Sequence, residues 1–207
     1  MGSGATGVDE EQIFRILFVA IYAVFFGVRI RYRVESARRE PERRQRLESL
    51  SSRILVIAIL GSYASITLYM LDVQWISWAR LALPPWLRWL GAAGAAFSVV
   101  LVAWTHRALG EQYSAELAIQ KDHALVTNGP YAKTRHPMYT ALNMFSLSIA
   151  VVTSNLVIMF FAVLVAVPFP WIAEEEERML LETFGDEYRE YMRRTGRFFP
   201  KIWERPG

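Results

Sequence analysis

Long uncharged stretches divide the chain and predict helices that cross a membrane. Residues 16–28, 54–71, 89–105 and 137–173 contain no Asp, Glu, Lys or Arg. A helix on the surface of a soluble protein needs a polar face, and these stretches offer none. Since roughly 20 apolar residues span the hydrocarbon core of a bilayer, the pattern predicts an all-α, polytopic membrane protein.

The last uncharged stretch is too long for one crossing. Its 37 residues would form a helix about 55 Å long at ~1.5 Å per residue, whereas the hydrocarbon core is only ~30 Å thick. Thr153-Ser154-Asn155 lies near its middle and supplies turn-forming side chains. We therefore expect a helical hairpin over 137–173, which brings the expected number of transmembrane helices to about five.

The first uncharged stretch is short, and Arg15 and Arg29 bracket it. Both arginines can extend their charged ends to the membrane surfaces and lengthen the usable span. The alternative is a cleaved signal peptide. Asp9, Glu10 and Glu11 stand where such a peptide carries basic residues. The sequence therefore favours a retained helix.

The distribution of arginines predicts the orientation. Residues 29–53 hold nine arginines, which outnumber the glutamates, and loops of this kind stay in the cytoplasm. The loop at 72–85 is then outside, and both 106–136 and 174–207 are cytoplasmic. The expected site therefore faces the cytoplasm.

The chain divides into two expected parts. Residues 1–105 hold three helices and the arginine-rich loop, and residues 106–207 hold the polar motifs and the hairpin. The net charge of +3 favours contact with the lipid bilayer over nucleic-acid binding. Without cysteine, and with only His106, His123 and His136 as histidines, no metal site is expected.

Two polar segments could carry chemistry. In Arg135-His136-Pro137, proline suits the first position of a helix, so His136 and Tyr139 would share one helix face. Four glutamates, 174–177, follow the last span, where Lys or Arg is usual. Carboxylates beside a basic loop favour a cationic ligand such as S-adenosylmethionine. Simpler readings remain open: His136 as a helix cap, Tyr139 as an interfacial aromatic, and the glutamates as a solvated helix end.

Linked motifs add a family resemblance. In order, they are His123-Ala-Leu-Val-Thr-Asn-Gly-Pro-Tyr131, Arg135-His-Pro-Met-Tyr139, the four glutamates, and Phe184-Gly-Asp-Glu-Tyr188-Arg-Glu-Tyr191. Over roughly 112–200, their order and spacing resemble the isoprenylcysteine carboxyl methyltransferase family. The resemblance implies an integral membrane methyltransferase that uses S-adenosylmethionine as cofactor, binds it in cytoplasmic loops over the hairpin, and acts on a lipophilic acceptor.

The resemblance also implies site residues. Those matching the family's cofactor segments are Gln120, His123, Ala124, Leu125, Val126, Tyr131, His136, Pro137, Met138, Tyr139 and Glu176. His136 and Glu176 are in addition the candidate catalytic residues, because an amine or hydroxyl acceptor would need a general base.

The chain departs from the family on the acceptor side. The family has an arginine four residues before the cofactor-binding glutamate, whereas this chain has Ile172, preceded by Trp171; we take both as candidate substrate residues. Either another cation, Arg135 or Arg178, replaces that arginine, or the acceptor lacks a carboxylate. We favour the second, with a phospholipid head group or a small hydrophobic metabolite methylated on O, N or S.

Two other classes of protein compete. An NADPH-dependent membrane reductase of the sterol type would need a phosphate-binding site, and the sequence contains no Gly-rich phosphate loop. A non-catalytic membrane protein, such as a transporter, would place ionisable groups at mid-membrane, where the uncharged stretches have none.

Overall fold

The protein is a bundle of long helices. The computed structural model describes residues 10–39, 50–71, 78–110 and 125–201. Its helices are α1 (Glu10–Arg39), α2 (Leu50–Met70), α3 (Pro85–Leu109), the short 3₁₀ helix η3 (Gly129–Ala132), α4 (Pro137–Thr153), α5 (Leu156–Ala166), α6 (Phe169–Phe184) and α7 (Asp186–Arg194). No strand occurs within these ranges, which confirms the all-α class.

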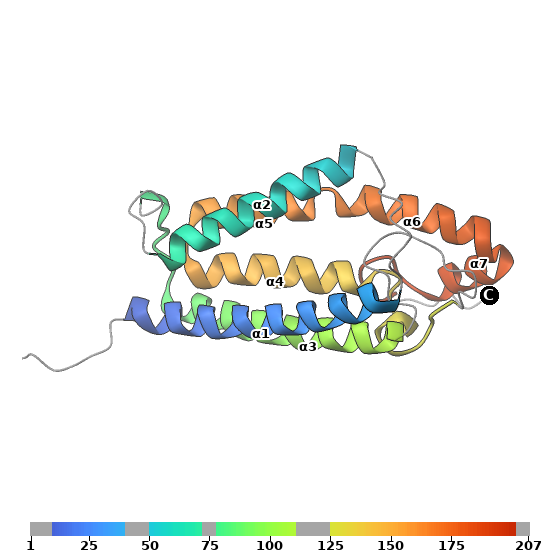
Figure 1. The fold of residues 1–207 in the computed structure, drawn as a ribbon, viewed down its shortest axis with the longest axis horizontal. Coiled ribbons are helices and arrows are strands. Elements are labelled where there is room, and N and C mark those ends of the chain that lie inside the picture. Colours follow the sequence, from blue (N-terminus) through green and yellow to red (C-terminus); the bar gives the residue numbers. More distant parts are fainter. Residues whose placement is uncertain (1–9, 40–49, 72–77, 111–124, 202–207) are drawn as a thin grey trace, which may run out of the picture.

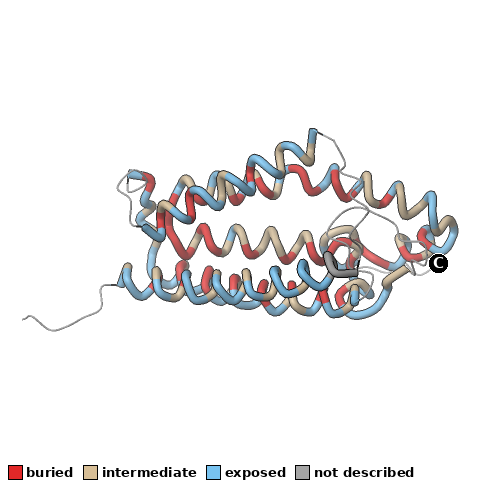
Figure 2. The backbone as a smooth tube through the Cα atoms, viewed as in Figure 1, coloured by how far each residue is buried: buried red, intermediate tan, exposed pale blue. Residues whose placement is uncertain are grey.

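Helix α4 lies at the centre of the bundle. Figure 1 shows α1 and α3 side by side on one side of it, and α2 and α5 on the other, while α6 and α7 extend beyond one end. Buried residues concentrate on α4 and on the helix faces turned towards it (Figure 2), and the outward faces of α1 and α2 are largely exposed. Exposed apolar faces of this extent suit contact with lipid.

The helix lengths confirm a polytopic membrane protein. Four helices are long and apolar enough to cross a bilayer: Glu10–Glu35 of α1, α2, α3, and Leu156–Phe184, which combines α5 and α6. The fifth expected helix, α4, is apolar but has only 17 residues.

The expected hairpin is confirmed at the α4–α5 connection. Ser154 adopts the left-handed conformation, with φ of 48°. The side-chain oxygen of Asn155 accepts hydrogen bonds from the amides of Val157 (3.0 Å) and Ile158 (3.3 Å). This side chain caps the start of α5, so the three polar residues do reverse the chain.

One expected helix end was wrong. Helix α1 continues to Arg39, so that Arg29, Arg31 and Arg33 lie on the helix rather than in a loop. Arginine is a good helix former, and no Pro or Gly occurs between Gly27 and Pro41. Helix α6, in contrast, carries all four glutamates, in keeping with their reading as the end of a helix; only a short break near Pro168 separates it from α5.

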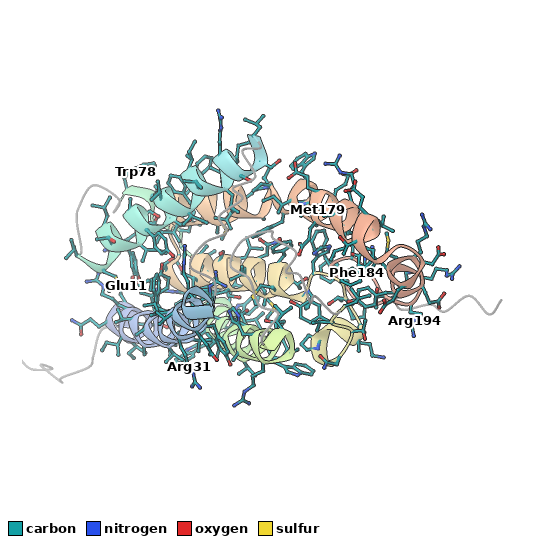
Figure 3. The ribbon with its side chains drawn as sticks, turned by 45° about the vertical axis from the view of Figure 1, so that its right-hand side comes forward. Glu11, Arg31, Trp78, Met179, Phe184 and Arg194 are labelled. Atoms are coloured by element: carbon teal, nitrogen blue, oxygen red, sulfur yellow. The ribbon has the colours of Figure 1, made fainter. Side chains whose placement is uncertain are left out.

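An ion pair between Glu11 and Arg88 connects α1 with α3. It lies at the end of the bundle remote from α7, since Figure 3 shows Glu11 and Arg194 at opposite ends. The Arg88 side chain is 9% exposed, and its Nη1 lies 2.8 Å from Glu11 Oε2. Arg88 Nε donates to the carbonyl of Val152 (2.9 Å), and the Tyr69 hydroxyl donates to Glu11 (3.0 Å). The cluster therefore links α1, α2, α3 and α4.

Replacing Glu11 with Gln should loosen this attachment. The variant keeps the shape of the side chain but removes the charge, and we expect the free energy of unfolding to fall by about 1 kcal/mol. Chemical denaturation in detergent measures it. Glu10→Gln, at the exposed neighbouring position, is the matched control. Equal stability of the two variants would show that the ion pair contributes nothing.

Candidate active site

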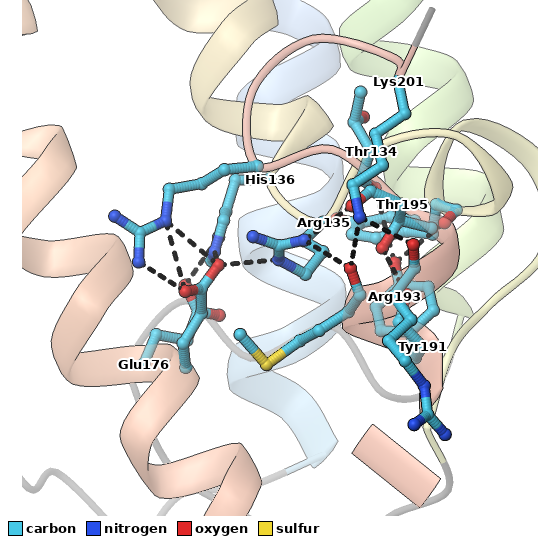
Figure 4. Close-up of polar contacts among 12 residues, drawn as sticks. Thr134, Arg135, His136, Glu176, Tyr191, Arg193, Thr195 and Lys201 are labelled. Carbon is cyan, nitrogen blue, oxygen red and sulfur yellow. Dashed lines mark hydrogen bonds and ion pairs between the residues drawn. The ribbon is translucent and has the colours of Figure 1, made fainter. Parts of the chain in front are cut away.

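The start of α4 directs His136 towards α6. Pro137 occupies the first helical position, as expected, and His136 precedes it without a side-chain cap hydrogen bond. Instead, His136 Nδ1 lies 3.3 Å from Glu176 Oε2, and Nε2 lies 3.2 Å from Glu177 Oε1 (Figure 4). The reading of His136 as a helix cap is therefore wrong: its buried ring bridges two carboxylates.

Tyr139 lies on the same face of α4 as His136, as the spacing predicted. Its hydroxyl donates to Glu176 Oε2 at 3.0 Å. Its ring is parallel to that of His136, with centroids 5.4 Å apart, and it also stacks on Phe169 at 4.7 Å. Tyr139 is thus more than an interfacial aromatic, because it fixes the Glu176 carboxylate against α4.

Glu177 is the most enclosed carboxylate of the cluster, with a side chain only 4% exposed. Arg135 Nε donates to Oε1 at 2.8 Å, and Arg197 Nη2 donates to Oε2 at 2.5 Å. With the His136 contact, three cationic side chains surround this one carboxylate. The sequence pointed to Glu176; it did not single out Glu177 or Arg197.

The segment after α7 brings Arg197 to the site. Its backbone runs beside residues 133–136: the Arg135 amide donates to the Gly196 carbonyl (2.8 Å), and the His136 amide donates to the Arg197 carbonyl (3.0 Å). The Thr140 hydroxyl donates to the carbonyl of Phe198 at 2.7 Å. These contacts fasten the segment across the start of α4.

Helix α7 and the residue that follows it also hold the segment before α4. The Tyr191 hydroxyl donates to the carbonyls of Tyr131 (2.8 Å) and Thr134 (3.3 Å). Arg135 Nη1 donates to the carbonyl of Thr195 at 2.6 Å. Tyr191, the second tyrosine of the Phe-Gly-x-x-Tyr-x-x-Tyr motif, is therefore a buried support for the segment before α4, and the buried ring of Tyr188 packs beside it, with centroids 5.7 Å apart.

The two carboxylates decide the charge of His136. Burial alone would lower its pKa, but the hydrogen bonds with Glu176 and Glu177 outweigh burial and raise the pKa above the usual 6.5. The hydrogen bond to Glu177 likewise raises the pKa of Arg197. Each ring nitrogen of His136 thus faces a carboxylate oxygen, an arrangement that favours the protonated form of the ring.

This raised pKa predicts a pH dependence of stability. Because the pKa of His136 is higher in the folded than in the unfolded state, its protonation stabilises the folded protein, fully so below about pH 6.5. This contribution is lost as the pH rises through the folded-state pKa. Thermal melting between pH 6 and 9 should therefore show decreasing stability for the wild type. His136→Gln should flatten that slope; an unchanged slope in the variant would assign it to other groups.

The remaining candidate residues are spread around the cluster. Leu125, Val126 and Tyr131 are half-buried, and Met138 is buried against α3, with its sulfur 3.6 Å from the Thr105 hydroxyl. Candidates Gln120, His123 and Ala124 fall outside the described residues.

The two candidate substrate residues differ in exposure. Trp171 is exposed, whereas Ile172 is buried with Ala58 and Phe169, beside Tyr139. Arg178, one of the proposed replacement cations, is exposed on α6, and Arg135 is engaged by Glu177. The position of Ile172 is therefore an apolar contact between α2, α4 and α6.

Comparisons with known proteins find similarity to membrane methyltransferases. A family model described as phospholipid methyltransferase matches residues 86–187. Human protein-S-isoprenylcysteine O-methyltransferase is 31% identical over 149 residues, covering 70% of this chain and 51% of that protein. The cobalt-zinc-cadmium resistance protein CzcN of Cupriavidus metallidurans is 30% identical over 132 residues, covering 63% and 54%. The chain thus spans about half the length of these curated relatives.

The fold also matches a solved structure. The eukaryotic intramembrane Ras methyltransferase ICMT (isoprenylcysteine carboxyl methyltransferase) aligns with a TM-score of 0.55 at 21% identity, covering 90% of this chain and 68% of that one. Fold and site together define a polytopic α-helical membrane protein with a polar cluster at one end of its bundle. The chain belongs to the isoprenylcysteine carboxyl methyltransferase family.

Proposed function

We propose that this protein is an integral membrane methyltransferase that transfers a methyl group from S-adenosylmethionine to a lipophilic acceptor. The observation that carries the proposal is the pair of adjacent carboxylates, Glu176 and Glu177, held against the start of α4 by His136, Tyr139 and Arg135. The family membership supports this reading of the pair.

The two carboxylates differ in how much of their charge is already matched. Glu177 is enclosed by Arg135, His136 and Arg197. The Glu176 side chain remains 31% exposed and is held by neutral Tyr139 and by His136. An exposed carboxylate with a fixed orientation fits a cationic ligand, and S-adenosylmethionine has both an ammonium and a sulfonium group.

When bound, S-adenosylmethionine supplies a methyl carbon activated by the positive sulfur. We propose that Glu176 holds its amino group and that Gln120, residues 123–126, Tyr131 and residues 136–139 contribute to binding the rest of it. The part played by the protein is then to orient both reactants and exclude water.

His136 suits a positioning role better than that of a base. Both of its nitrogens face carboxylates, so neither nitrogen points at a site from which it could accept the proton of an acceptor. An amine or hydroxyl acceptor would need a base other than Glu176, because the Glu176 carboxylate is here assigned to the amino group of the cofactor. An acceptor carboxylate is already ionised and needs no base.

The proposed acceptor enters from the bilayer. Ile172, Phe169 and Ala58 form an apolar cluster next to Tyr139, and Trp171 is exposed beside them. The human and mouse relatives are named for isoprenylcysteine, an acceptor of this lipophilic kind. A phospholipid head group or a small hydrophobic metabolite is the second candidate, favoured by the absence of a positive charge at Ile172.

We further propose that the cluster faces the cytoplasm, and that residues 1–105 serve mainly as the membrane support for a methyltransferase core in 106–207. The arginine bias predicts that residues near 36 and 207 are both cytoplasmic. Ser36→Cys and Gly207→Cys should resist a membrane-impermeant thiol reagent on intact cells and react after permeabilisation. Efficient labelling of either on intact cells would contradict this orientation.

Ligand-induced stabilisation tests the proposed function. At 100 times its dissociation constant, a ligand adds about 2.7 kcal/mol to the free energy of unfolding. We expect S-adenosylhomocysteine to raise the melting temperature and NADPH to leave it unchanged. Stabilisation by NADPH alone would favour the reductase class, and stabilisation by neither would favour a non-catalytic membrane protein.

A further inference from the structure

We infer that Arg197, from the segment that follows α7, binds a carboxylate of a ligand at this site. This inference rests on the proposed function and addresses the acceptor side, where Ile172 replaces the arginine found in the family. The resemblance offered Arg135 or Arg178 as substitutes. The structure favours a third arginine, Arg197, which follows α7 in the sequence and pairs with Glu177.

The hydrogen bonds of Arg197 leave part of its guanidinium free. Nε lies 3.2 Å from both oxygens of Glu177, and Nη2 lies 2.5 Å from Oε2. Its Nη1 has no hydrogen-bond partner within the described part of the chain. The side chain is 38% exposed, whereas the Glu177 side chain is 4% exposed. One edge of the guanidinium is thus anchored on a buried carboxylate, and the other is open.

The other cations near the site are less suited to bind a ligand. The Arg135 side chain is 10% exposed, and it is committed to Glu177 and to the carbonyls of Met192 and Thr195. His136 contacts a carboxylate with each nitrogen.

The charge balance also favours an additional anion. Arg135 and Arg197 both pair with the one carboxylate of Glu177. These two guanidinium groups therefore share a single negative charge, with exposed Glu174 at a greater distance. A ligand carboxylate at Arg197 Nη1 would balance the charge and form a charge-assisted hydrogen bond.

Arg197 lies next to one of the expected cofactor segments. Its carbonyl accepts the His136 amide at 3.0 Å, and the neighbouring Phe198 ring lies 5.8 Å from the His136 ring. Arg197 therefore adjoins the start of the segment 136–139, which matches the family's second cofactor segment. The carboxylate could belong to the amino-acid part of the cofactor or to the acceptor, and binding measurements distinguish the two sources.

The test compares matched ligand pairs that differ in one carboxylate. Calorimetric titration measures the affinities of wild-type protein and Arg197→Gln for S-adenosylhomocysteine and its decarboxylated analogue, and for N-acetyl-S-farnesylcysteine and its methyl ester. We expect Arg197→Gln to lower the affinity for the carboxylate-bearing member of one pair roughly 10- to 150-fold. The affinity for the other member of that pair should not change. The affected pair identifies the source. Arg197→Lys should recover part of the loss, and Arg178→Gln is the control.

Two results would overturn the inference. The first is that Arg197→Gln binds the carboxylate-bearing ligands as tightly as the wild type does. The second is that it loses affinity equally for both members of each pair. Either result would show that Arg197 only supports the fold. Failure of the proposed function is distinguishable, because wild-type protein would then bind no S-adenosylhomocysteine. That failure would remove this inference with it.

Discussion

Replacing Glu177 with Ala should destabilise the protein more than any other single change at the site. The substitution leaves Arg135, His136 and Arg197 without their shared carboxylate. Removing one partner of a buried ion pair costs about 3–5 kcal/mol, and we expect a loss of free energy of unfolding in this range. Denaturation of purified protein in detergent measures it.

Two variants separate the charge of Glu177 from its volume. Glu177→Gln fills the same space without the charge and should lose most of the same stability. Glu176→Gln, at the neighbouring and more exposed position, should lose much less. Equal losses at 176 and 177 would contradict the view that Glu177 is the structural carboxylate and Glu176 the one available to a ligand.

Glu176→Gln should instead weaken ligand binding. If the Glu176 carboxylate holds the amino group of the cofactor, losing this charge-assisted hydrogen bond costs about 1.5–3 kcal/mol, or roughly 10- to 150-fold in affinity. Calorimetric titration with S-adenosylhomocysteine gives the value directly. The glutamine keeps an oxygen for the Tyr139 hydroxyl, so the packing of α4 against α6 should persist.

The control for this variant lies further along the same helix. Glu182 is exposed on α6, and Glu182→Gln removes the same charge at a distance from His136. It should bind S-adenosylhomocysteine as the wild type does. A Glu176→Gln protein with wild-type affinity would remove Glu176 from the cofactor site.

Much of the fold follows from local sequence signals. Thr153-Ser154-Asn155 predicted the reversal between α4 and α5, since Asn155 caps α5 and Ser154 adopts the left-handed conformation. Proline at the first helical position fixed the starts of α3 and α4. The end of α1 was harder to place, because charge patterns mark the membrane boundary and a helix can continue beyond it.

The site was only partly predictable, for two physical reasons. Consecutive residues on a helix point about 100° apart, so motif spacing could not tell whether Glu176 or Glu177 is enclosed by Arg135. Arg197 comes from a segment held by backbone hydrogen bonds to residues 133–136, and no side-chain pattern encodes that pairing. His136 and Tyr139, in contrast, lie one helical turn apart, and their shared face was evident from spacing.

The most direct test of the central claim is methyl transfer itself. Purified protein in lipid vesicles is incubated with S-adenosylmethionine labelled in its methyl group, with either N-acetyl-S-farnesylcysteine or a membrane lipid extract as acceptor. We predict that label enters a lipophilic product with one of these acceptors, and that Glu176→Gln greatly reduces the rate at a limiting concentration of S-adenosylmethionine. No incorporation with either acceptor, by wild-type protein that binds S-adenosylhomocysteine, would contradict the assignment of a lipophilic acceptor.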